Sequence, residues 1–172
     1  MKLNDLSAQS EWLGQHIPHR LRASLAQTVM LENMVAAQYP SKKERAKKLK
    51  FCLDMAAWEG RHAATRWLID FVGVNGDSNG SPTESSRRKG KKAHVHDVDI
   101  TDLPGGVYFP LGTSDAELLG AVWKGCSQAT SHATSGSNHP SVARDKISQA
   151  VLVVVRHLND TIYKEAGAEV TF

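Results

Sequence analysis

The residues with the clearest potential for chemistry lie between Ser127 and Lys146, in the stretch SQATSHATSGSNHPSVARDK. It separates two segments with amphipathic helical spacing and contains His132, His139 and Arg144. A histidine just before a helix and an arginine in its first turn would surround backbone N–H groups that lack intrahelical partners. Such a cluster favours an anion such as phosphate. The alternative is an ordinary connector between two helices.

Positive charge gathers in two clusters, although the net charge is only +3. One cluster opens a long helical pattern and the other lies in a polar segment, while two further arginines lie mid-helix. Clustered Lys and Arg favour an anionic partner such as nucleic acid, although such runs also form solvated faces. The candidate nucleic-acid-binding residues are Lys42, Lys43, Arg45, Lys47, Lys48, Arg61, Arg66, Arg87 and Arg88.

Motifs for metal binding or nucleophilic catalysis are missing from the sequence: it has no CxxC, HExxH, GxSxG, P-loop or dinucleotide fingerprint. Glu59-x-x-His62 lacks the second ExxH that a di-metal centre in a helical bundle needs. His94 and His96 would share one face of a strand, which leaves a metal there open. We therefore expect no cofactor and assign no metal ligands.

Five helical segments position these residues. Their expected bounds are a short helix around 6–17, then 18–37, 41–72, 114–126 and 141–167. Ser-x-x-Glu capping boxes at Ser41 and Ser114 open two of them, Ser141 is the expected N-cap of the last, and Gly167 is its expected stop. Apolar spacing in the longest helix predicts a buried face of Leu49, Leu53, Ala56, Gly60, Ala63, Trp67 and Phe71.

Residues 75–92 contain no aliphatic or aromatic side chain and are expected to form a flexible basic linker or a long loop. The segments VHDVDI and VYF flank the turn-like DLPGG, which predicts a β-hairpin over residues 95–109. The expected fold is all-α: an antiparallel bundle of about five helices with a minor β-hairpin insertion, in one domain over residues 1–172.

Hydropathy predicts a chain that does not span a membrane. The longest apolar run, Val151 to Val155, has five residues, and the N-terminal run is too polar for a signal peptide. A cytoplasmic location is expected. Cys52 and Cys126 fall within helical patterns, as expected for reduced core thiols.

The layout resembles the HEPN superfamily of small prokaryotic helical bundles. The resemblance covers about residues 17–166 and rests on the long basic helix, the variable insertion, the SQATSHAT…NHPS connector and the terminal helix ARDKISQAVLVVVRHLNDTIY. Many HEPN proteins are ribonucleases, or their non-catalytic relatives, in toxin–antitoxin, abortive-infection and CRISPR-linked systems. The family's arginine-to-histidine spacing is not reproduced after Arg144, where positions 149 to 151 are Gln, Ala and Val.

The resemblance implies an RNA- or nucleotide-interacting protein of a prokaryotic defence or toxin–antitoxin module. If the chain cleaves RNA, it would do so without a metal. His132 and His139 would then be the general acid and base, and Arg144 would stabilise charge in the transition state. The alternative is a non-catalytic helical subunit for protein–protein assembly or homo-oligomerisation, with Trp12, Trp58, Trp67 and Trp123 as aromatic anchors.

Overall fold

A computed structural model of the chain describes residues 6–21, 43–90, 98–131 and 142–168. This part is mostly helical with one two-stranded antiparallel sheet, which confirms the predicted predominance of helix. Four α-helices have both ends within this part; residues 17–21 are also helical, and the rest of the helix predicted over 18–37 lies outside the described residues. The α-helices are α1 (Leu6–Glu11), α3 (Lys43–Phe71), α4 (Ser114–Ser131) and α5 (Arg144–Leu158). The shorter elements are the π-helical turns η1 (Trp12–His16) and η3 (Asn159–Tyr163), the 3-10 turn η2 (Ile100–Asp102), and the strands β1 (Val74–Gly76) and β2 (Pro82–Glu84).

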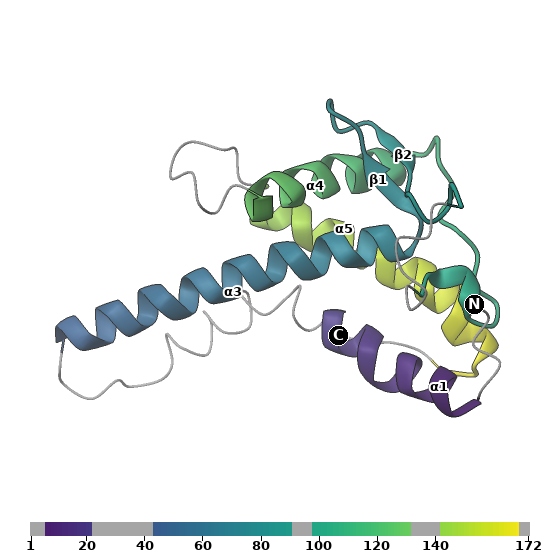
Figure 1. The fold of residues 1–172 in the computed structure, drawn as a ribbon, viewed down its shortest axis with the longest axis horizontal. Helices are drawn as coiled ribbons and strands as arrows, with labels where there is room; N and C mark the ends of the chain where they lie inside the picture. Colours follow the sequence, from purple (N-terminus) through teal and green to yellow (C-terminus); the bar gives the residue numbers. More distant parts are fainter. Residues whose placement is uncertain (1–5, 22–42, 91–97, 132–141, 169–172) are drawn as a thin grey trace.

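Helix α3 is the long axis of the molecule. Its C-terminal half packs beside α4 and α5, whereas its N-terminal half extends past the described ends of both (Figure 1). The helix ends where predicted, because Gly73 follows with φ +88°, a left-handed conformation that glycine adopts without steric cost. The long basic helix can therefore carry charge well away from the core.

The buried face of α3 agrees with the predicted one only at its C-terminal end, where Phe71 is buried and Trp67 is partly buried against the core. Ala56, Gly60 and Ala63 are exposed, while Ala64 and Leu68 are buried beside them. The predicted and the observed buried faces are offset by one residue in the sequence, which corresponds to a rotation of about 100° around the helix. Small residues bury little apolar area, so the larger side chains at the C-terminal end decide the orientation. As a result, the polar residues of the mid-helix, Arg61, His62 and Thr65, turn into the core.

The β-hairpin lies earlier in the chain than predicted. Strands β1 and β2 pair in the register Val74↔Glu84 and Gly76↔Pro82, within the segment expected to be a linker, and the hairpin rests on α4. The described part of the segment expected to hold the hairpin, residues 98–109, contains η2 instead, and a capping box between Asp99 and Asp102 caps the N-terminus of this turn. Residues 91–97 lie outside the described part of the chain.

Helix α5 carries the apolar stripe that its spacing predicts. Ile147, Val151, Val154 and Leu158, continued by Ile162 in η3, are all buried in one core cluster shared with α3 and α4. The helical segment then ends just before Gly167, whose φ is +66°, as predicted. No helix in the described ranges is long and apolar enough to cross a membrane.

Helix α4 begins at Ser114, so its cap lies one residue before the predicted one. The Thr113 hydroxyl accepts the backbone N–H of Ala116 at 3.1 Å, so Thr113 and not Ser114 is the capping residue. We expect Thr113→Ala to lower the free energy of unfolding by about 1 kcal/mol, measured by urea denaturation, because one helical N–H loses its acceptor. Ser114→Ala, the matched control, should change stability little; the reverse order of effects would contradict this cap.

Candidate anion-binding junction

The structure describes some of the predicted site residues and not others. His132 and His139 lie outside the described residues, as do Lys42 and the predicted N-cap Ser141. Helix α5 starts at Arg144, so the arginine occupies the first turn as expected. Its N-cap is Ala143, whose side chain makes no capping hydrogen bond, and Ser141 lies too far before the helix to fill that position.

Arg61 links α3 to the start of α5. Its side chain is only 2% exposed, and its guanidinium donates through Nη2 to the backbone carbonyl of Arg144 at 3.0 Å. These two residues are 83 positions apart in the chain. We call their surroundings the junction: Arg61, His62 and Thr65 from α3, Cys126 from α4, and Arg144 from α5.

The junction concentrates positive charge. Burial lowers the pKa of Arg61, and the nearby positive charge of Arg144 lowers it further. Two guanidinium groups therefore repel each other there, and a bound anion would offset that repulsion. Burial raises the pKa of the Cys126 thiol to about 12, against the opposing pull of Arg61 and Arg66. Cys126 is thus a protonated core thiol at neutral pH and does not supply a nucleophile.

His62 is held as a neutral imidazole. Its Nδ1 lies 2.7 Å from the carbonyl oxygen of Trp58, so Nδ1 carries the proton and Nε2 presents a lone pair. Burial is the main cause that lowers the pKa of His62. Within the described part of the chain, His62 Nε2 and Thr65 Oγ1 are buried without a hydrogen-bond partner. Buried polar atoms in this state call for a ligand, water or ion to satisfy them.

The N-terminus of α5 adds backbone donors to this charge. The first N–H groups of a helix lack intrahelical acceptors and carry the positive end of its dipole. Ala143 supplies no side-chain acceptor for them, and Arg144 is exposed beside them. The arrangement can hold a phosphate between the Arg144 side chain and the backbone N–H groups, and the positive charge of Arg61 lies nearby.

Three of the arginines predicted to contact nucleic acid make contacts within the protein. Arg66 lies over the Trp123 ring at 5.2 Å, and Arg87 donates to the carbonyl of Val98. Arg88 donates to the carbonyl of Phe109 at 2.9 Å and pairs with Glu84 at 3.2 Å. Arg87 therefore links the residues that follow the hairpin to Val98, just before η2, and Arg88 links them to Phe109, after η2.

The remaining candidates lie in the first turns of α3. Lys43, Arg45, Lys47 and Lys48 belong to the half of the helix that extends beyond α4 and α5 (Figure 1). The positions of their side chains are not described. The helix backbone places Lys43 and Lys47 on one face, since residues four apart are neighbours on a helix.

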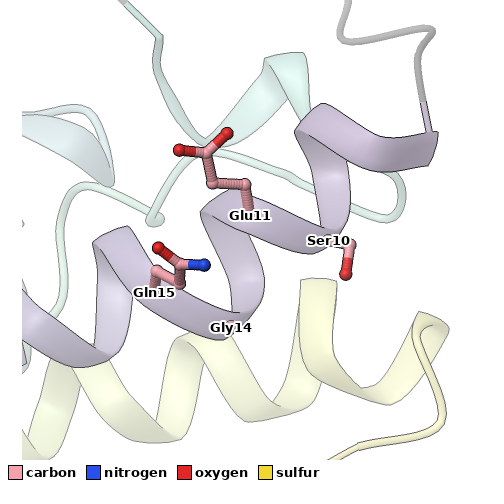
Figure 2. A pocket seen from close by; sticks show the side chains of 4 residues that line it. All are labelled: Ser10, Glu11, Gly14 and Gln15. Carbon is pink, nitrogen blue, oxygen red and sulfur yellow. The ribbon is translucent and has the colours of Figure 1, made fainter.

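Other hollows and clusters fit an anion less well. Figure 2 shows a polar hollow along α1 and η1, lined by Ser10, Glu11, Gly14 and Gln15. The Glu11 carboxylate there pairs with His16 at 3.3 Å and would repel phosphate. No group of three or more metal-binding side chains occurs in the ranges that the structure describes, and His94 and His96 lie outside them.

Comparison of the chain with family models, with curated proteins and with solved structures gave no match.

Proposed function

We propose that the protein binds RNA or a nucleotide through phosphate contacts at the junction, in keeping with its resemblance to HEPN proteins. The observation that carries this proposal is the contact of Arg61 with the backbone of Arg144 at a helix start without a side-chain cap. Two guanidinium groups and the first backbone N–H groups of α5 then lie near one another, and phosphate is the biological anion that matches such donors best.

The basic half of α3 extends this surface. Lys43 and Arg61 are 18 residues apart on one continuous helix, a length of about 27 Å at 1.5 Å per residue. A single-stranded RNA backbone could run from the basic tip of α3 to the start of α5. Affinity would then come mainly from phosphate contacts and carry little sequence preference.

Cleavage is a further part of the proposal. His132 and His139 belong to the connector that joins α4 to α5, so both are tied by short chain lengths to the junction. One would act as general base and the other as general acid, and Arg144 would stabilise the developing negative charge, without a metal. Such a ribonuclease would suit a defence or toxin–antitoxin module.

Arg144→Ala tests the phosphate contact. The substitution keeps the backbone carbonyl that Arg61 binds, so the fold should remain intact. We expect RNA affinity to fall about tenfold at low salt, because a hydrogen bond to a charged group is lost. The slope of log K against log salt should decrease by about one. Fluorescence anisotropy with a short single-stranded RNA measures both quantities.

Lys164→Ala is the matched control, because Lys164 is exposed and lies just beyond η3, at the opposite end of α5. It removes the same formal charge from the protein and should leave the slope nearly unchanged. Equal losses in the two variants would show that only net charge matters and would contradict a phosphate site at the junction.

A further inference from the structure

Helix α5 presents a second surface, on the side opposite its core stripe. The exposed residues Asp145, Gln149, Leu152 and Arg156 follow one another at intervals of four, three and four. Such spacing places them in one narrow row along the helix. We call these four residues the α5 row. It is about 16 Å long, from 11 residues at 1.5 Å each.

The α5 row borders a shallow hollow between α4 and α5. The hollow is lined by Asp115, Leu118, Gln149, Leu152, Val153, Val155 and Arg156, so it is apolar at its centre and charged at one end. Leu152 is 53% exposed and is one of two large apolar side chains that stand out in the described part of the chain. A leucine beside an apolar hollow favours contact with another apolar surface.

The order of side-chain types along the α5 row favours a second copy of this chain as the partner. From Asp145 to Arg156 the side chains are acidic, polar, apolar and basic. When two copies of this row lie antiparallel around a two-fold axis between Gln149 and Leu152, Asp145 of each faces Arg156 of the other. The same operation sets each Leu152 against Gln149 and the adjoining hollow of the other copy. A row that complements itself under a two-fold axis is the requirement for an isologous dimer.

We propose that the protein forms a homodimer in which α5 packs antiparallel against α5 of a second copy. A stable dimer buries about 800 Å² per partner, more than one helix row supplies, so the dimer is weak and depends on concentration. Arg144 lies about 100° around the helix from Asp145, so pairing leaves the junction accessible. The proposal stands independently of RNA binding.

Arg156 already has one acidic neighbour, since its Nη2 lies 3.6 Å from Asp115 in the same chain. Both side chains of that pair are about half exposed or more, and such surface pairs contribute little to stability. A guanidinium has five donors, so Arg156 can bind Asp115 and the partner's Asp145 together. Substitutions in the α5 row should therefore alter association without unfolding the chain.

Two charge reversals test the arrangement by sedimentation velocity over a concentration series. Asp145→Arg alone sets arginine against arginine in a homodimer, and Arg156→Asp alone sets aspartate against aspartate. We expect each variant to be monomeric where the wild-type protein dimerises. Mixed in equal amounts they should form a heterodimer, because both facing pairs are then oppositely charged.

Leu152→Asp should abolish association, and circular dichroism should show unchanged helix content in all three variants. Three results would overturn the proposal: a wild-type protein that stays monomeric throughout the series, dimers of both charge-reversal variants as strong as the wild type, or a mixture that remains monomeric.

Discussion

Replacing Arg61 by alanine is expected to lower the free energy of unfolding by about 3 kcal/mol. The substitution empties the volume of a long side chain that is 2% exposed and removes its hydrogen bond to the Arg144 carbonyl. The first turn of α5 would then lose the contact that ties it to α3. Urea denaturation followed by circular dichroism measures the loss.

Arg61→Met separates the structural role of this residue from its charge. Methionine fills most of the volume and makes no charged contact, and apolar replacement of a buried charge is often close to neutral for stability. We expect this variant to be clearly more stable than Arg61→Ala and yet to bind RNA about tenfold more weakly, a factor equal to about 1.4 kcal/mol. Wild-type affinity in a folded Arg61→Met would contradict a role for this charge in binding.

Gly120→Ala is expected to destabilise the protein by about 2 kcal/mol through overpacking. A Cβ at this position in α4 would lie 2.8 Å from the Cα and N atoms of Pro82 and 2.9 Å from the carbonyl oxygen of Gly80. All three atoms belong to the backbone of the hairpin, and a backbone cannot move aside by a change of rotamer as a side chain can. The hairpin would have to move away from α4, and thermal denaturation would detect the loss.

Gly60→Ala supplies the control for a glycine within a helix. No atom lies within 4 Å of a Cβ added there, and the residue is exposed on α3. Alanine should stabilise the protein by up to about 1 kcal/mol, because it has the higher helix propensity. Gly120→Ala and Gly60→Ala should therefore change stability in opposite directions. Stabilisation by both would contradict the close contact between the hairpin and α4.

Local patterns in the sequence predicted those parts of the fold that depend on neighbouring residues. The apolar stripe from Ile147 to Ile162 and the stop at Gly73 follow from helical periodicity and from the left-handed preference of glycine. The hairpin was misplaced because its strands have three residues each and rest on α4 through glycines. The dipeptide Asn79-Gly80, which lies between the two strands, is a typical turn signal and could have located it.

The candidate site was predictable only in part. Helical spacing placed Arg144 in the first turn of the last helix, as the structure has it. The contact with Arg61 joins residues 83 positions apart and depends on which face of α3 is buried. Small residues left that face ambiguous in the sequence, so Arg61 was grouped with the candidate nucleic-acid-binding residues. The position of Arg61, His62 and Thr65 between the apolar residues Ala57, Ala64 and Leu68 was the available signal of a buried polar cluster.

The most direct test of phosphate binding at the junction is a two-dimensional ¹H–¹⁵N NMR titration at low salt. Inorganic phosphate and then a short single-stranded RNA are added, and the backbone amides of Arg144, Asp145 and Lys146 are followed, since these open α5 behind Ala143. Saturable shifts of these amides with both ligands, reduced in Arg144→Ala, are the predicted result. RNA binding that shifts other amides and leaves the first turn of α5 unchanged would contradict the account.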